Sequence, residues 1–330
     1  MPFDFLQDKS ILITGGTGSF GQRCVEILLN ETQAKRVIIF SRDELKQSQM
    51  QMRLSDPNGR LRFFIGDVRD RERLERAFWG VDYVIHAAAL KQVPALEYNP
   101  FEAVKTNILG TQNVINAAID QDVRKVMLVS TDKAANPANL YGATKLCAER
   151  LVISSNVYAP RDKTRLSVVR YGNVLGSRGS LLRVIEVQRQ TGRITLTHEA
   201  MTRFWITLTQ GVHFVLGSLE RMQGGEIFIP KIPSMRVKEF IQLVAPECRL
   251  DVVGIRPGEK LHEVLITPEE ARRAREFDSF FVILPESEDP WFEAEAYQDG
   301  KPAQDGWHFA SHTNAEWLDE THLKSLLETI

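Results

Sequence analysis

The stretch ILITGGTGSFG, residues 11–21, decides the fold. Its apolar first part ends in three glycines, Gly15, Gly18 and Gly21, which are spaced three residues apart. The apolar residues between 20 and 28 then recur at helical spacing. A strand that leads through a glycine turn into a helix is typical of a dinucleotide site, because the free N–H groups at the helix N-terminus bind the pyrophosphate.

The pattern around this stretch predicts α/β architecture. Short apolar runs, at residues 10–14, 36–40, 61–66, 83–88, 125–130 and 166–170, alternate with helical periodicity. The longest helical stretch is predicted to be one helix over residues 99–119, with Pro100 in its first turn. Such alternation favours a doubly wound parallel sheet of the Rossmann type.

The alternation of strand and helix patterns becomes less regular after residue 170, where loop-like segments rich in Gly, Pro and Arg begin. We therefore predict a dinucleotide-binding domain over residues 1–170 and a smaller, mostly substrate-binding lobe over residues 171–330. A strand near residues 226–230 is expected to return to the main sheet. The tail from residue 286 onward is acidic, and no role for it follows from its sequence.

Composition excludes several classes of function. The 330 residues are 43% hydrophobic and 25% charged, with a formal net charge of −2. This balance argues against a nucleic-acid partner or a membrane surface, and the apolar runs are too short to cross a bilayer. The three cysteines and the histidines show no pairing or metal-ligand spacing. A cytoplasmic protein without a bound metal is expected.

The end of the second predicted strand bears on the choice of cofactor. An acidic residue at this position usually binds the ribose of NAD, whereas here Ser41, Arg42 and Lys46 are suited to a 2′-phosphate. NADP is therefore favoured, and NAD stays open if Asp43 binds the ribose. The expected cofactor contacts are Gly15, Thr17, Gly18, Ser19, Phe20, Gly21, Ser41, Arg42, Asp43, Glu44, Leu45, Lys46, Asp67, Val68, Ala87, Thr106, Tyr141, Lys145 and Val174.

A second stretch, STDKAANPANLYGATK at residues 130–145, carries candidate chemistry. Tyr141 and Lys145 are four residues apart and would share one face of a helix. A free phenol has a pKa of about 10, and a nearby ammonium together with a positive nicotinamide ring would lower it. On spacing alone, the better interpretation is that Asp132 caps a turn and Lys133 is a solvated loop residue.

Several motifs in order carry a family resemblance: TGGTGSFG, NILGTQNVINAA, YGATK, RYGNVLG and RPGEKLHE. The chain resembles the extended short-chain dehydrogenase/reductase superfamily, and within it the UDP-N-acetylglucosamine 4,6-dehydratases that invert C5 and begin pseudaminic acid synthesis for bacterial surface and flagellar glycans. Retaining relatives usually have an N-terminal membrane region and a methionine in place of the tyrosine. The start of the chain and Tyr141 both favour the inverting branch.

The resemblance implies catalytic roles for five residues. Tyr141 and Lys145 would oxidise C4 with the cofactor, and Thr131 would hydrogen-bond O4. Asp132 would be the general acid at O6, with a raised pKa, and Lys133 the base at C5, with a lowered pKa. The related dTDP-glucose dehydratases have Asp-Glu where this sequence has Asp-Lys.

The resemblance also implies a UDP-N-acetylglucosamine site and a homo-oligomer. Arg256 would bind the diphosphate and Glu259 the ribose, although RPGEK is also compatible with a simple turn. The further expected substrate contacts are Lys91, Asn173, Arg178, Gly179, Ser180, Leu181 and Leu182. A C4 epimerase and a non-catalytic NADP-binding sensor are the alternative functions.

Overall fold

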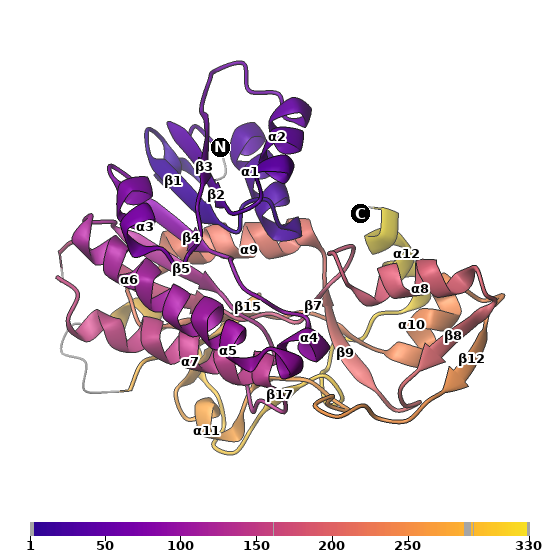
Figure 1. Cartoon of the computed structure of the whole chain (residues 1–330). Coiled ribbons are helices and arrows are strands. Elements are labelled where there is room, and N and C mark those ends of the chain that lie inside the picture. The colour runs from indigo at the N-terminus through magenta and orange to yellow at the C-terminus, as the bar shows by residue number, and fades with distance from the viewer. Residues whose placement is uncertain (1–2, 161, 287–291, 293, 329–330) are drawn as a thin grey trace.

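The computed structural model describes residues 3–160, 162–286, 292 and 294–328. Within these residues, ten strands form one sheet in the order β16-β14-β15-β10-β6-β5-β4-β1-β2-β3 (Figure 1). In that order the strands are Lys301–Pro302, Ala274–Glu276, Phe280–Ile283, Ile227–Pro230, Arg165–Val169, Lys125–Val129, Tyr83–His86, Ser10–Thr14, Arg36–Ser41 and Leu61–Ile65. The strands from β10 to β3 are parallel, and β15, β14 and β16 are joined in antiparallel fashion.

All six strands predicted from the sequence are present, with bounds that move by two residues at most. Apart from the edge strand β3, whose residues are partly exposed, their apolar residues are mostly buried because helices cover both faces of the sheet. Along one face lie α1 (Ser19–Glu31) and α9 (Leu208–Arg221), and along the other lie α3 (Arg71–Phe78), α6 (Gly110–Asp120) and α7 (Leu140–Ser154) (Figure 1). The predicted doubly wound sheet is confirmed.

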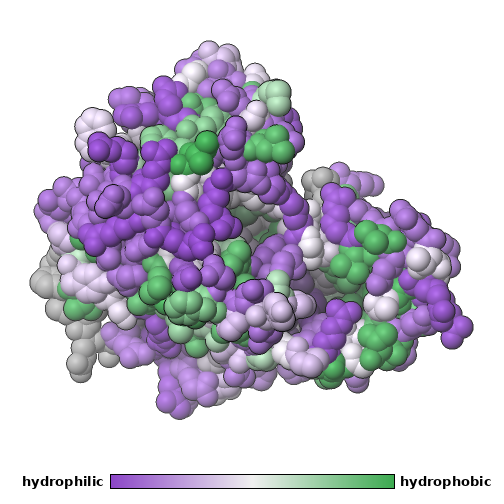
Figure 2. Space-filling model, in the orientation of Figure 1, coloured by the Kyte–Doolittle hydropathy of each residue, from purple (hydrophilic) through white to green (hydrophobic). Residues whose placement is uncertain are grey.

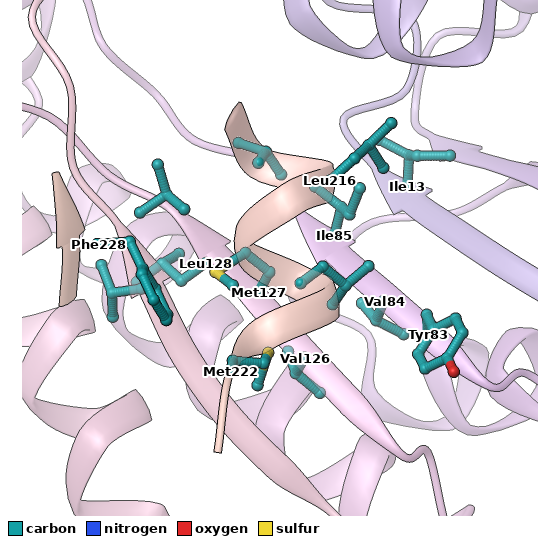
Figure 3. Packing of buried hydrophobic residues seen from close by; sticks show 14 of the residues in the cluster. Ile13, Tyr83, Val84, Ile85, Val126, Met127, Leu128, Leu216, Met222 and Phe228 are labelled. Carbon is teal, nitrogen blue, oxygen red and sulfur yellow. The ribbon is translucent and has the colours of Figure 1, made fainter. Parts of the chain in front are cut away.

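Helix α9 forms part of the main core, although it lies in the second half of the chain. Leu216 and Met222 pack beside Ile85, Val126 and Met127 of the central strands (Figure 3). These side chains are at most 1% exposed. Burial of a side chain of this size contributes about 1.5–3 kcal/mol, so the second half of the chain stabilises the sheet of the first.

The helix predicted over residues 99–119 is not continuous. It consists of α5 (Pro100–Ala103), a π-helix over Val104–Leu109 and α6. In the wider π turn, the Asn107 side chain accepts from Leu90 N–H at 2.8 Å and donates to the Leu90 carbonyl at 2.9 Å. The prediction of one α-helix was wrong because its 3.6-residue periodicity does not reveal a locally wider turn.

A smaller lobe lies beside the sheet (Figure 1, right). Its strands are β7 (Asn173–Val174), β8 (Arg193–Leu196), β9 (Thr202–Ile206), β11 (Ser234–Arg236) and β12 (Arg249–Val252), and its helices are α8 (Leu181–Arg189), α10 (Val237–Val244) and α12 (Glu320–Glu328). Trp205 stacks on Phe240, with ring centroids 4.4 Å apart, at the centre of a separate core. Apolar side chains also gather on the outer surface of this lobe (Figure 2).

Segments from the second half of the chain also extend the main body. Strands β10, β15 and β14 continue the large sheet, and β13 (Val264–Ile266) pairs with β17 (Phe309–Ala310). The remaining short elements are α2 (Glu44–Arg53), α4 (Val93–Tyr98), α11 (Pro268–Ala271), η1 (Asp4–Leu6), η3 (Ser155–Val157) and η4 (Ala294–Tyr297). In the part of the chain that the structure describes, no helix is both long and apolar enough to cross a membrane.

A buried charge network joins α7, β6 and α11. The Arg170 guanidinium is 0% exposed and lies 2.6 Å from Glu149 Oε2 and 2.9 Å from Glu270 Oε2. The guanidinium also donates to the Leu265 carbonyl at 2.8 Å. Because a buried charge without a partner is costly, this network favours one arrangement of the three elements.

Candidate active site

Two adjoining cavities follow the carboxyl ends of the parallel strands, where ligands bind in open α/β sheets. Their volumes are about 450 and 520 Å³, and Gly15, Gly18, Ala87, Ala89 and Arg178 line both. We call the first the catalytic cavity and the second the adenosine-side cavity. The catalytic cavity lies among residues that follow β1, β4, β5 and β6.

The glycine turn between β1 and α1 has little room for side chains. Gly15 has a φ of +68°, and a Cβ there would lie 2.9 Å from the Ala88 backbone. A Cβ at Gly21 would lie 2.5 Å from the Gly16 backbone. The loop after β7 closes on this turn, because Arg178 donates to the Thr17 carbonyl at 2.7 Å and its N–H donates to Ser19 Oγ at 3.0 Å.

Replacing Gly15 with alanine is expected to weaken cofactor binding and lower the free energy of unfolding. The variant combines an unfavourable φ with a backbone clash, so the loss should exceed about 1 kcal/mol. Gly59→Ala is a matched control, because Gly59 has a φ of +60° and open space around its Cβ position. Thermal unfolding and dinucleotide titration of both variants measure the difference. Equal losses in the two variants would contradict a role for close packing at Gly15.

The adenosine-side cavity collects most of the residues predicted near the second strand. Its lining includes Thr17, Ser41, Arg42, Asp43, Lys46, Asp67, Val68 and Thr106. Glu44 and Leu45 were also predicted as cofactor contacts, but neither lines a cavity, because both lie in the first turn of α2 and Leu45 is 67% exposed. Thr106 Oγ1 is buried and has no hydrogen-bond partner within the described residues, so it can bind a ligand in this cavity.

The loop after β5 and the start of α7 bring the predicted catalytic residues together. Thr131, Lys133, Tyr141 and Lys145 all line the catalytic cavity. At the contact between the two segments, a Cβ on Gly142 would lie 2.2 Å from the Lys133 carbonyl oxygen. Glycine at this position therefore allows α7 to approach the loop closely enough for one cavity to contain all four residues.

Tyr141 and Lys145 occupy the same helix, but their environments differ from the prediction. Lys145 Nζ donates to the Val129 carbonyl at 2.9 Å, and burial lowers its pKa to about 8 although Glu149 raises it. Burial raises the pKa of Tyr141 to about 12, and the opposing effects of Lys133 and Thr131 do not overcome it. The predicted lowering of the Tyr141 pKa is therefore wrong for the chain by itself, because desolvation is the largest effect.

Asp132 and Lys133 form an ion pair rather than a solvated turn, with a buried carboxylate and an ammonium side chain that is 27% exposed. Asp132 is 0% exposed, and its Oδ1 lies 3.0 Å from Lys133 Nζ and accepts from Thr131 Oγ1 at 2.9 Å. Burial raises the pKa of Asp132, in the predicted direction. The predicted lowering of the Lys133 pKa is wrong: desolvation lowers it, but Asp132 and then Glu263 more than compensate, so it is raised.

The predicted substrate residues divide into two groups. Lys91, Asn173, Arg178, Gly179 and Ser180 line the catalytic cavity, as does the predicted cofactor contact Val174. Desolvation lowers the pKa of Lys91, and the charges of Lys133 and Arg178 act in the same direction. Asn173 Oδ1 and Ser180 Oγ are buried without a hydrogen-bond partner in the described structure, so both can bind a ligand.

The other four predicted substrate residues line neither cavity. Leu181 and Leu182 pack against the core of the smaller lobe at the start of α8, where Ile185 of the same helix is buried. Arg256 is exposed on the loop after β12. Glu259 Oε1 lies 3.7 Å from Arg203 and 3.5 Å from Thr197 Oγ1, whereas Glu259 Oε2 is buried without a hydrogen-bond partner in the described structure.

His86 is a buried residue of β4. Its ring nitrogens lie 2.7 Å from Thr14 Oγ1 and 3.0 Å from Thr111 Oγ1. Burial lowers its pKa to about 3, so the ring is neutral. Among the described residues, no group of three or more His, Cys, Asp or Glu side chains is arranged to hold a metal ion.

Comparison with known proteins places this site in a family. The family model described as "Polysaccharide biosynthesis protein" matches residues 11–285. The chain belongs to this family. A Campylobacter jejuni protein named UDP-N-acetylglucosamine 4,6-dehydratase (inverting) is 47% identical over 329 residues, covering 98% of this chain and 97% of the relative. The resemblance predicted from the sequence is therefore confirmed.

Two further relatives show how the family varies. A Rickettsia canadensis protein named UDP-glucose 4-epimerase is 40% identical over 290 residues, covering 86% of this chain and 84% of the relative. The solved structure of Pen from Bacillus thuringiensis is 38% identical, with a TM-score of 0.89 and coverage of 98% of both chains. The fold therefore extends over almost the whole chain, and the family includes proteins named for different reactions.

Sequence reasoning missed one side chain beside the catalytic pair. Glu263 Oε1 lies 3.2 Å from Lys133 Nζ, and the Glu263 carboxylate also lies 3.7 Å from Arg203 and 3.7 Å from Lys260. It belongs to the quoted motif RPGEKLHE, where only Arg256 and Glu259 received roles. The signal available was a glutamate directly before a buried strand, where an unpaired carboxylate would be unfavourable.

Proposed function

We propose that this protein is an NADP-dependent UDP-N-acetylglucosamine 4,6-dehydratase that inverts C5 and catalyses the first step of pseudaminic acid synthesis. The observation that carries the proposal is the Asp132–Lys133 pair, 3.0 Å apart: Lys133 lines the catalytic cavity with Tyr141, and the buried Asp132 lies directly behind it. The 47% identity with the inverting dehydratase of Campylobacter jejuni supports it. A cytoplasmic homo-oligomer is part of the proposal, since the resemblance implies one.

The residues present fit a dinucleotide. The turn at Gly15 lets the backbone approach a pyrophosphate, and Thr106 Oγ1 offers an unsatisfied polar atom in the adenosine-side cavity. When bound, the nicotinamide supplies hydride chemistry, accepting a hydride from C4 and returning it to C6. Gly18, Ser19, Asp67 and Val68 would contact the rest of the cofactor, since they line the two cavities.

Two features favour NADP over NAD. Arg42 lines the adenosine-side cavity and is a half-exposed cation 3.6 Å from Asp67. The Asp43 carboxylate caps α2, because it accepts from Lys46 N–H at 2.9 Å and also binds Lys46 Nζ. Its oxygens are therefore engaged in local contacts that compete with binding to a ribose diol.

Replacing Arg42 with alanine is expected to weaken NADP binding about tenfold or more, since a hydrogen bond to a charged group contributes about 1.5–3 kcal/mol. NAD binding should change little. Fluorescence titration with NADPH and NADH measures both affinities. Arg62→Ala is a suitable control, since the Arg62 guanidinium donates to carbonyls of its own loop. An unchanged NADPH affinity would contradict the assignment of NADP.

The first half of the reaction is the oxidation of C4. Tyr141 would accept the O4 proton, and Thr131 would hydrogen-bond O4 as charge develops there. Lys145 donates a hydrogen bond to the Val129 carbonyl and would thereby fix the position of α7, and of Tyr141 on it, relative to the cofactor site. The raised pKa of Tyr141 means that binding of substrate and cofactor must favour the phenolate before proton transfer.

The second half is the loss of water. Oxidation at C4 makes the C5 proton acidic, because it then lies next to a carbonyl group. Lys133 would remove this proton, and Asp132 would protonate O6 as it leaves. Both residues lie at the end of β5, so one loop supplies the base and the acid. Reprotonation of C5 from the opposite face gives the inverted configuration.

A C4 epimerase is the alternative that a specific observation favours, since the relative from Rickettsia canadensis is named UDP-glucose 4-epimerase. An epimerase needs Tyr141 but has no use for an acid at O6. Incubation with UDP-N-acetylglucosamine and NADP, followed by mass spectrometry, distinguishes the two. A product lighter by one water supports the dehydratase, whereas a product of unchanged mass supports the epimerase. Cofactor binding without turnover would favour a sensor.

A further inference from the structure

Glu263 is a second carboxylate in contact with the Lys133 ammonium, beside the acid that the proposed function uses. Lys133 Nζ is 3.0 Å from Asp132 Oδ1 and 3.2 Å from Glu263 Oε1, so one ammonium lies between two carboxylates. Glu263 is 2% exposed, and Asp132 is 0% exposed. Burying these two carboxylates around one partly exposed ammonium, an ion triad, is costly unless the geometry is well fixed.

The backbone of Glu263 is held firmly in place. Its N–H donates to Ser311 Oγ at 3.0 Å, and its carbonyl accepts from Ser311 N–H at 2.8 Å. Ser311 Oγ lies 2.6 Å from Thr202 Oγ1, which ties the contact to β9. The second half of the chain therefore delivers a carboxylate to a pair that the first half supplies.

Three more charged groups surround the triad. Arg203 and Lys260 each approach the Glu263 carboxylate at 3.7 Å and supply positive charge there. Lys260 Nζ is also fixed, because it donates to the Ala135 carbonyl at 2.7 Å. Lys91 and the Tyr141 phenol share the cavity with Lys133, and both interact with it electrostatically.

We infer that Glu263 is a positioning residue for the elimination step, which holds Lys133 against Asp132 so that one proton can pass between them. The inference rests on the proposed dehydratase function. In the resting pair Lys133 is an ammonium and Asp132 a carboxylate. Breaking an N–H bond of Lys133 and forming an O–H bond on Asp132 creates an amine and a carboxylic acid together.

The reaction then returns the pair to its starting state. The Lys133 amine takes the C5 proton and becomes an ammonium again. The Asp132 carboxylic acid gives its proton to O6, which leaves as water, and becomes a carboxylate again. Proton and charge balance without any external acid or base, because the two transfers are equal and opposite. Glu263 keeps its charge throughout, since Lys133, Arg203 and Lys260 lower its pKa against the opposing effect of burial.

The charge of Glu263 also sets the pH range of the pair. The active pair carries one proton in total, so activity is lost when the pair takes up a second proton or loses the first. Burial raises the pKa of Asp132, and Glu263 acts in the same direction. Glu263 also raises the pKa of Lys133. Removing its charge therefore lowers the pKa at both limits of the active range.

The test is the pH dependence of water loss from UDP-N-acetylglucosamine in the full-length protein with NADP. In Glu263→Gln, both limbs of the kcat/KM profile should move to lower pH by about one unit or more. In Glu263→Asp, the charge is kept and the reach is shortened, so kcat should fall while the limbs stay near their original pH. Glu226→Gln is the matched control: Glu226 is 0% exposed in a separate network with Ser167 and Tyr297, and its loss should leave both limbs in place.

A second variant, which should shift the pH profile in the opposite direction, covers the case in which Glu263→Gln does not fold. Lys260→Met removes a positive charge near Glu263 and Lys133, so it should move the upper limb to higher pH. Unmoved limbs in folded Glu263→Gln, or in Lys260→Met, would overturn the inference while the dehydratase function stands. No water loss by the unmodified protein would instead overturn the function itself.

Discussion

Lys133→Ala should lose dehydration and keep C4 oxidation. A general base typically contributes about a hundredfold to ten-thousandfold to a rate, and Lys133 is the group assigned to the C5 proton. The variant keeps Tyr141, Thr131 and Lys145, so reduced cofactor should still form from UDP-N-acetylglucosamine. Rapid-mixing absorbance of the reduced nicotinamide measures the oxidation, and mass spectrometry of the product measures water loss.

Lys125→Ala is the matched control for this experiment. Lys125 Nζ donates to the Leu219 carbonyl at 3.0 Å, at the opposite end of β5 from the cavity. Its loss should leave water loss at the rate of the unmodified protein. Dehydration at the normal rate in Lys133→Ala would mean that another group is the base at C5, and the assigned chemistry would have to be abandoned.

Tyr141→Phe should abolish both halves of the reaction. Without the phenol, no group in the catalytic cavity is assigned to accept the O4 proton, so C4 oxidation should fall about a hundredfold to ten-thousandfold and water loss should fall with it. The same two measurements apply. The combined loss distinguishes Tyr141 from Lys133, since elimination at C5 cannot begin before C4 is oxidised.

Tyr297→Phe controls for the removal of a buried phenol. Tyr297 donates to Glu226 Oε1 at 2.8 Å in the main core and does not line the catalytic cavity. Its loss should lower the free energy of unfolding by about 1 kcal/mol without affecting turnover. If Tyr141→Phe still produced reduced cofactor at the normal rate, Tyr141 would not be the acceptor of the O4 proton.

The main sheet was predictable because its signal is local. The parallel strands inside the sheet are apolar runs buried on both faces, and the helices between the strands carry 3.6-residue periodicity. The same logic failed over residues 99–119, where the π turn serves a contact between Asn107 and Leu90 that no periodicity encodes. The antiparallel strands β14, β15 and β16 also escaped prediction, since their partners lie elsewhere along the chain.

The residues of the site also divide into those predictable from local sequence and those brought in by distant segments. Tyr141, Lys145 and the Thr131–Lys133 segment were predicted because they fall within one short stretch of sequence. Glu263 lies far from that stretch and meets Lys133 only through the fold. The direction in which the Lys133 pKa is shifted depends on this contact with Glu263 and on the contact with Asp132. The sequence contains no information about the distance from Lys133 to either carboxylate. Electrostatic predictions from sequence therefore fail where distant segments converge.

The most direct test of the account is the product formed from UDP-N-acetylglucosamine in deuterated water. Proton NMR should show a 4-keto-6-deoxy sugar with deuterium at C5 and inverted configuration at that carbon, because Lys133 removes the C5 proton and solvent replaces it on the opposite face. A product with the original C5 proton, or one that retains O6, would contradict the account.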